Sequence, residues 1–243
     1  MSNLGGSSRP PKVLNMAEIK DFHNMHQGPV AILCNGPTLQ DALPYLEDYD
    51  TIGMNASIAH WPSKYWVALD APSVWRGITY EHKPEVLFTS SMPMPKTEHV
   101  GIETVSIDSD FRKFGWSNDL TECIHPCRAT VWFTMQVAAW MGYDPLLLVG
   151  FDLTGPRPLH HVHEGEKMQK TAINRQLQLM GYFKAMQELG RIETRVYNCS
   201  PISLCEAFPL YSLRKKCVVE DEPDVRVVNV GKLQEELLGK RKV

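Results

Sequence analysis

The chain has 243 residues, 43% of them hydrophobic, with a formal net charge of -3 and a pI of about 6.3. This size favours one enzyme-sized domain with a core of its own. The slightly acidic charge excludes an overall basic field for holding nucleic-acid phosphates. None of the six cysteines forms a Cys-x-x-Cys pair, and no apolar run reaches the roughly 18 residues of a membrane span. We therefore expect a cytoplasmic protein with reduced thiols, at most peripheral to a membrane.

The two ends of the chain differ in composition from the middle. Residues 2–12 are rich in glycine, serine and proline, which predicts a flexible N-terminal arm and lead-in over residues 1–28. Residues 214–243 are charged, with an acidic cluster at 220–224 and a short strand candidate at 225–230. Such an extension can cover a sheet edge or join two copies of the chain, so a homo-oligomer is one expectation. Residues 29–213 form the predicted single domain.

A short apolar run at residues 29–34 stops abruptly at Asn35-Gly36-Pro37-Thr38. An apolar run bounded by glycine and proline predicts a buried strand followed by a loop. A tight turn in which asparagine and glycine supply unusual backbone angles is the alternative.

The same pattern of a strand that ends at a short polar side chain recurs along the sequence. The runs at residues 50–54, 64–69, 145–151 and 193–197 are followed, or ended, by Asn55, Asp70, Asp152 and Asn198. Asparagine and aspartate often end strands by bonding to their own backbone. Five such endings, however, predict that one edge of a parallel sheet is lined with amides and carboxylates, where ligands bind in open α/β sheets.

Two helices are predicted between these strands. Residues 129–141 are apolar almost all round and are followed by Gly142, which predicts a buried helix that leads into the strand at 145–151. Residues 167–189 are amphipathic and are followed by Gly190. The succession of strand, helix and strand predicts an α/β, Rossmann-like, mostly parallel sheet with flanking helices.

The loop at residues 153–166 contains three histidines within four positions, His160, His161 and His163. Histidine is the usual general base near neutral pH, and a loop between the sheet edge and a long helix can fold over a substrate as a lid. Two other interpretations stay open. The histidines can bind a metal, or they are polar loop residues without a specific role.

Several motifs together resemble the bacterial sialyltransferases of glycosyltransferase family 42. They are ILCNGPTL, GMN, the block RATVWFTMQVAAWMGYDPLLLVGFDL and NCSPISL. The wider superfamily also contains motility-associated glycosyltransferases and archaeal 6-hydroxymethylpterin pyrophosphokinases. The likeness spans residues 30–208. It implies a GT-A-variant Rossmann-like fold, a cytidine monophosphate (CMP) sugar as donor, and catalysis without a metal or other cofactor.

The resemblance also implies which residues contact the nucleotide. The family's Asn-Gly-Pro-Ser turn falls on residues 35–38, with threonine in place of serine, and its second-strand asparagine falls on Asn55. Asp70 replaces a family asparagine, while Thr130 keeps the hydroxyl of a family Thr-Ser-Gly motif. Together with Asp152 before the loop, the predicted nucleotide- and donor-binding residues are Asn35, Gly36, Pro37, Thr38, Asn55, Asp70, Thr130 and Asp152.

The family's lid histidine, which deprotonates the acceptor hydroxyl, aligns best with His163, and His161 is the alternate. The family's paired lid tyrosines have no counterpart between Asp152 and Lys167, although Arg157 can replace them electrostatically. The sequence thus predicts a glycosyltransferase that moves a sugar from a nucleotide-sugar donor to an acceptor hydroxyl. A glycan, a protein, a small molecule or a modified nucleic-acid base can each be the acceptor.

Three alternatives to this function stay open. Asp108-Ser109-Asp110 has the Asp-x-Asp form with which many glycosyltransferases bind a divalent cation and a nucleotide diphosphate. Asp70 and Asp152 can instead hold Mg²⁺ in a pyrophosphokinase, where neutralising the triphosphate charge dominates catalysis. The missing tyrosines and Asp70 also suit a nucleotide-binding module without turnover.

Overall fold

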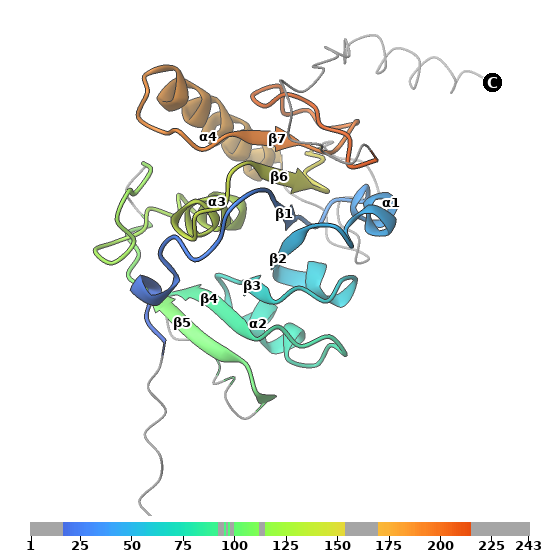
Figure 1. Cartoon of the computed structure of the whole chain (residues 1–243), viewed down its shortest axis with the longest axis vertical. Helices are drawn as coiled ribbons and strands as arrows, with labels where there is room; N and C mark the ends of the chain where they lie inside the picture. The colour runs from blue at the N-terminus through green and yellow to red at the C-terminus, as the bar shows by residue number, and fades with distance from the viewer. Residues whose placement is uncertain are drawn as a thin grey trace, which may run out of the picture.

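The computed structural model describes residues 17–91, 95, 97, 100–111, 115–153 and 170–214. Within these residues seven strands form one sheet, in which every neighbouring pair is parallel and the order is β5-β4-β3-β2-β1-β6-β7 (Figure 1). The strands are β1 (Val30–Leu33), β2 (Asp50–Met54), β3 (Tyr65–Val67), β4 (Val86–Ser90), β5 (Glu103–Ile107), β6 (Leu146–Val149) and β7 (Val196–Asn198). The predicted Rossmann-like α/β sheet in a single domain is confirmed.

Helices cover both faces of this sheet. The helices are α1 (Leu39–Ala42), α2 (Ala71–Gly77), α3 (Thr130–Trp140) and α4 (Lys170–Glu188), with short 3-10 turns at η1 (Ile19–Phe22), η2 (Leu43–Tyr45) and η3 (Asn55–Ala59). Side chains along a strand alternate between faces. Ile32 of β1 therefore joins the core cluster that contains α3 and α4, whereas Leu33 joins the cluster on the α1 side. Because both faces are covered, the strands β1, β3 and β6 are continuous apolar runs that are buried throughout.

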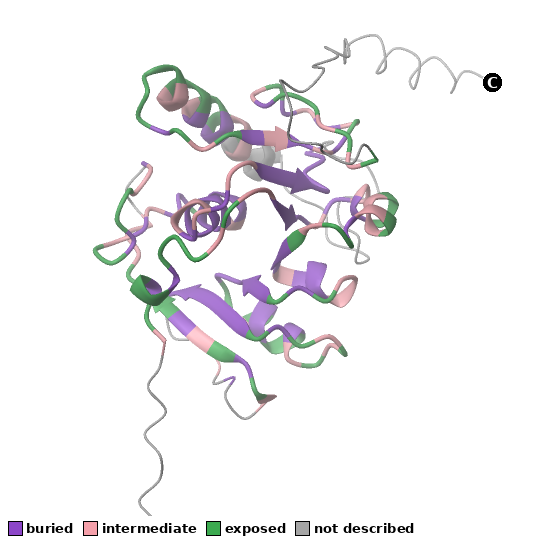
Figure 2. Cartoon of the chain, viewed as in Figure 1, coloured by how far each residue is buried: buried purple, intermediate pink, exposed green. Residues whose placement is uncertain are grey.

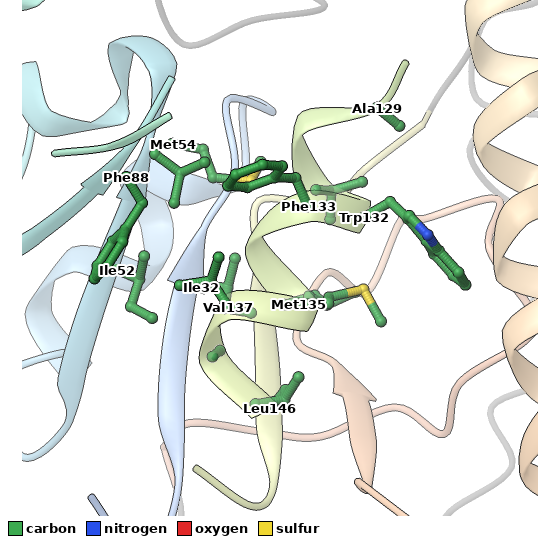
Figure 3. Close-up of a cluster of buried hydrophobic side chains, with 14 of the residues drawn as sticks. Ile32, Ile52, Met54, Phe88, Ala129, Trp132, Phe133, Met135, Val137 and Leu146 are labelled. Atoms are coloured by element: carbon green, nitrogen blue, oxygen red, sulfur yellow. The ribbon is translucent and has the colours of Figure 1, made fainter. Parts of the chain in front are cut away.

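Helix α3 fills the space between the sheet and α4. Figure 3 shows Phe133 and Val137 on the side of the helix that faces β1 and β2, and Trp132 pointing away from the sheet. Trp132 packs edge-on against Phe183 of α4, with ring centroids 5.9 Å apart. The helix is thus enclosed on two sides, which explains why its sequence is apolar all round. Figure 2 shows the same concentration of buried residues in α3 and the strands.

Three elements, β4, α1 and α2, were not predicted from the sequence, and one predicted strand is shifted. The expected strand at residues 193–197 begins only at Val196 and ends at Asn198. The preceding residues connect α4 to the sheet. Gln187 of α4 donates to the Thr194 carbonyl (2.5 Å), and Asp144 accepts from the Arg195 backbone N–H (2.8 Å). The Leu146 N–H also donates to the Arg195 carbonyl (2.9 Å), so these contacts lead directly into the pairing of β6 with β7. The strand candidate at 225–230 lies outside the described residues.

The described part of the N-terminal lead-in packs on the domain. Ile19 and Phe22 are buried in the same cluster as α3, and Trp140 donates its indole N–H to the Ile19 carbonyl (2.9 Å). No helix among the described residues is both long enough and apolar enough to cross a membrane.

The lead-in also places His26 at the end of the sheet where the strands begin. Its ring stacks on Tyr143, with centroids 4.4 Å apart, and its Nε2 lies 2.9 Å from the Tyr65 hydroxyl. Asp50 lies 3.7 Å from Nδ1. Burial lowers the pKa of His26 from its ordinary value of 6.5; the charge of Lys64 lowers it further, while Asp50 opposes the shift.

This lowered pKa predicts that the protein loses stability in mild acid. The unfolded chain binds a proton at His26 more readily than the folded chain does. Neutral His26 therefore adds its full share to the free energy of unfolding at a pH above the pKa of the unfolded chain. It is lost as the pH falls through that value toward the folded pKa. We expect His26→Phe, which keeps the stacking on Tyr143, to reduce the fall in melting temperature between about pH 8 and about pH 5. Parallel melting curves for the two proteins would contradict this assignment.

Candidate functional site

The strand order reverses at β1. From β1 the chain adds β2, β3, β4 and β5 on one side, and then returns to place β6 and β7 on the other. In open parallel sheets ligands bind outside the carboxyl ends of the strands at such a switch point. Here two loops leave this point, residues 34–38 after β1 and residues 150–153 after β6. We call them the switch-point loops.

The two switch-point loops are bonded to each other beyond the end of the strands. Cys34 N–H donates to the Val149 carbonyl (2.8 Å) and Gly36 N–H to the Gly150 carbonyl (2.9 Å). A Cβ at Gly36 would lie 2.5 Å from the Asp152 carboxylate and even closer to the Gly150 carbonyl. Position 36 therefore requires glycine because of this close approach.

Asp152 connects the two loops through its side chain. Only 3% of this residue is exposed, and both of its oxygens bind Thr38: Oδ2 accepts from the backbone N–H (2.9 Å) and Oδ1 from the hydroxyl. A buried carboxylate needs such donors to offset its lost hydration. Burial, and secondarily the charge of Asp152, raise the pKa of the neighbouring Cys34 thiol. The structure thus gives Asp152 a positioning role toward residues 35–38.

Two asparagine side chains at this edge carry unused hydrogen-bond acceptors. The Oδ1 atoms of Asn35 and Asn55 are buried and have no hydrogen-bond partner among the described residues. Asn55 follows β2, the neighbour of β1, and its backbone adopts a left-handed conformation with φ of 48°. Leaving a buried acceptor unpaired costs about 1–3 kcal/mol. Both predicted residues therefore lie at the ends of adjacent strands, ready to accept hydrogen bonds from a ligand.

The N-terminus of α3 lies at the same edge. In Figure 3 the helix starts with Ala129 at the level of Met54, the last residue of β2, and runs toward Leu146, the first residue of β6. Ala129 is the N-cap and makes no side-chain cap bond, so it leaves first-turn N–H groups without a capping side chain. Thr130 is the first helical residue. Such an end attracts anions, phosphate groups among them.

Asp70 has a structural role that was not predicted from the sequence. It is the N-cap of α2: its Oδ1 accepts from the Ser73 backbone N–H (2.8 Å) and its Oδ2 from the Ser73 hydroxyl (2.9 Å). An aspartate caps a helix well, which explains a carboxylate where the resembled family has an amide. Its contact with the donor stays a prediction.

The structure does not bring the Asp-x-Asp sequence to the switch point. Asp108 and Asp110 follow β5, the outermost strand, and β4, β3 and β2 separate this strand from β1. The backbone of both residues bonds to Ile124. Among the described residues no group of three or more histidines, cysteines, aspartates or glutamates is arranged to hold a metal ion.

The predicted catalytic histidines, His161 and His163, lie outside the described residues, as do His160 and Arg157. The part of their loop that is described begins at the switch point. Leu153, directly after Asp152, is buried and has a left-handed φ of 47°. The assignment of the base to His163, with His161 as the alternate, stays a prediction.

Ser200 is a further residue at this edge that was not predicted. It follows β7 in a loop that returns to the switch point, where Leu204 N–H donates to the Asp152 carbonyl (3.1 Å). The Ser200 hydroxyl is buried and has no partner in the described part of the chain, whereas its N–H donates to Asn198 Oδ1 (3.0 Å). The hydroxyl-rich sequence NCSPIS, which follows the last strand, could have indicated a further polar residue at this edge.

No protein-family model matches the chain, and no curated protein matches its sequence. Its structure is similar to that of the MAf glycosyltransferase from Magnetospirillum magneticum AMB-1, with a TM-score of 0.58 and 16% sequence identity. The match covers 90% of this chain and 40% of that protein, so the chain spans less than half of its length.

A second solved structure, a variant of the sialyltransferase CST-II in complex with CMP, matches over 81% of this chain and 92% of its own. Its identity of 13% and TM-score of 0.39 are too low to add to the conclusion. Neither structure is a pyrophosphokinase, so that part of the predicted superfamily has no support. The chain shares the fold of a motility-associated glycosyltransferase, as the resemblance of its motifs predicted.

Proposed function

We propose that the chain is a glycosyltransferase domain that binds a nucleotide sugar at the switch point and transfers the sugar to a hydroxyl. The observation that carries this proposal is the pair of buried, unpartnered amide oxygens of Asn35 and Asn55 at the ends of adjacent strands. The hydroxyl and amino groups of a nucleoside can donate the hydrogen bonds that these two oxygens do not receive from the protein. The fold, shared with a glycosyltransferase, supports the same assignment.

The phosphate has a separate place in this proposal. The first turn of α3 and the Thr130 hydroxyl offer donors to the phosphate that leaves with the nucleotide, where the helix dipole favours negative charge. Asp152 acts indirectly, because its bonds to Thr38 fix the loop that carries Asn35. CMP is the favoured nucleotide, on the resemblance of the Asn-Gly-Pro-Thr turn to family 42.

Transfer also requires that the acceptor hydroxyl loses its proton. In the proposed reaction the bond between the anomeric carbon and the donor phosphate oxygen breaks, the acceptor oxygen bonds to that carbon, and the proton passes to a histidine. We assign this base to His163, with His161 as the alternate. Donors at the α3 N-terminus stabilise the charge that develops on the phosphate.

Nucleotide binding tests the proposal directly. The purified protein is titrated with CMP, UDP, GDP and ATP, with and without Mg²⁺, while its melting temperature is followed. We expect a metal-independent rise with CMP, since a ligand at about 100 times its Kd adds about 2.7 kcal/mol to the free energy of unfolding. Asn35→Ala and Asn55→Ala should weaken the response, whereas Asn118→Ala, at an exposed asparagine outside the switch-point loops, should preserve it.

Two results would contradict this assignment. A rise only with a diphosphate or triphosphate plus Mg²⁺ would favour the magnesium alternatives and make Asp70, Asp108, Asp110 and Asp152 the residues to change. The absence of any rise would exclude the switch point as a nucleotide site.

A further inference from the structure

A cavity of about 590 Å³, distinct from the switch point, lies between α3 and the end of α4. Its walls come from residues 116–118, from Gln136, Ala139 and Trp140 in the second half of α3, and from residues 190–194, which lead into β7. Because α3 starts at the switch-point edge and runs away from it, the cavity lies toward the opposite edge of the sheet. Its size falls within the roughly 300–1,000 Å³ of small-molecule pockets.

The walls of this cavity are fixed by hydrogen bonds. Gln136 is 1% exposed; its Oε1 accepts from the Ser117 N–H (2.9 Å), and its Nε2 donates to the carbonyls of His125 and Trp132 (3.2 Å each). The Trp132 indole N–H donates to the Gly115 carbonyl (3.0 Å). Residues 115–118 are thus held against α3 by hydrogen bonds. This wall of the cavity is therefore already in place before a ligand binds.

The lining combines two indoles with neutral and balanced polar groups. Trp116 packs edge-on against Trp132 (5.6 Å between centroids). Trp140 is half-buried beneath the His23 ring, at 4.1 Å. Asn118, Arg191 and Glu193 are exposed, and their side chains have no hydrogen-bond or ion-pair partner among the described residues. Among the lining residues the charges of Arg191 and Glu193 offset each other, and the one other ionisable group is the His23 imidazole. The lining therefore carries no strong net charge that would attract a phosphate or a carboxylate.

We propose that this cavity is a second binding site, which takes a neutral saccharide of one or two rings. A sugar ring has an apolar C–H face that can pack on an indole, and hydroxyls that both donate and accept hydrogen bonds. Trp116 supplies the first kind of contact, because the His23 ring already covers one face of Trp140. Asn118, Arg191 and Glu193 supply donors and acceptors for the hydroxyls. The site is separate from the switch point and does not depend on nucleotide binding there.

Saturation-transfer NMR tests this site with the neutral disaccharides lactose, maltose, cellobiose and diacetylchitobiose, and with glucose 6-phosphate as a charged comparison. We expect saturable binding of at least one neutral disaccharide. Asn118→Ala and Glu193→Ala should each weaken it about tenfold, as expected for losing one well-placed hydrogen bond. Both residues are exposed, so these variants should melt as the wild type does.

Two control variants separate this site from other surfaces. Trp75→Phe alters an indole that is 57% exposed in α2, and Asn35→Ala alters the switch point; both should bind the disaccharide normally. The proposal is overturned if no neutral disaccharide binds, if Asn118→Ala and Glu193→Ala bind it unchanged, or if glucose 6-phosphate binds more tightly. Loss of binding in Asn35→Ala would place the sugar at the switch point instead.

Discussion

Gly36→Ala is expected to destabilise the domain by about 3 kcal/mol and to abolish its response to nucleotide. The new methyl group would overlap the Gly150 carbonyl and the Asp152 carboxylate. Moving either neighbour costs free energy. The Gly150 carbonyl is backbone next to β6, and the Asp152 carboxylate is held by two hydrogen bonds from Thr38. Relief requires the switch-point loops to separate, which displaces Asn35. Thermal unfolding with and without CMP measures both effects.

Gly181→Ala is the matched control. Gly181 lies in α4 and a Cβ added there has no atom within 4 Å. Because alanine is favoured over glycine inside a helix by about 1 kcal/mol, this variant should melt at or above the wild-type temperature and respond normally to CMP. A Gly36→Ala protein that behaves like Gly181→Ala would show that the loops are not locked in the way described.

The strands nearest the switch point could be predicted because they are buried on both faces. β1, β2, β3 and β6 are short apolar runs with abrupt polar endings, and this pattern depends on local sequence alone. Parallel strands then bring those endings to one edge. The proximity of Asn35 and Asn55 follows from this argument, although nothing in the sequence states that β1 pairs with β2.

The missed strand β4 does not end in asparagine or aspartate as the predicted strands do. β4 ends at Ser90, whose hydroxyl is buried without a partner among the described residues, so a search for strands that end in asparagine or aspartate passes over it. The helix α2 has only seven residues, too few for a clear apolar period. Its signal was the cap: Asp70 is followed by Ala-Pro, and proline is favoured in the first turn.

The hydrogen bonds between Thr38 and Asp152 could not be predicted from local sequence for a different reason. Thr38 and Asp152 are 114 positions apart, so their hydrogen bonds depend on the placement of β6 beside β1. The sequence shows two hydrogen-bonding residues at strand ends. It does not show that each satisfies the other and that Asp152 consequently holds residues 35–38 in place.

The largest effect on turnover is expected for His163→Ala. If His163 removes the proton of the acceptor hydroxyl, its loss should lower kcat by roughly 10²–10⁴-fold. The variant should melt normally and keep its response to CMP, because Asn35, Asn55 and the α3 N-terminus are unchanged. Release of CMP from a CMP-sugar measures this turnover, with water as the acceptor where no other is supplied.

The control substitutions distinguish a base from a histidine that merely supports the loop. His82→Ala, between α2 and β4, should turn over normally. His161→Ala should leave kcat within a few-fold if His163 is the base, and the order of the two effects reverses if His161 is. Added imidazole should restore part of the turnover of the deficient variant, because it replaces the lost proton acceptor but not a lost structural contact. Normal kcat in both variants would remove His161 and His163 from the mechanism and contradict the assignment of the base.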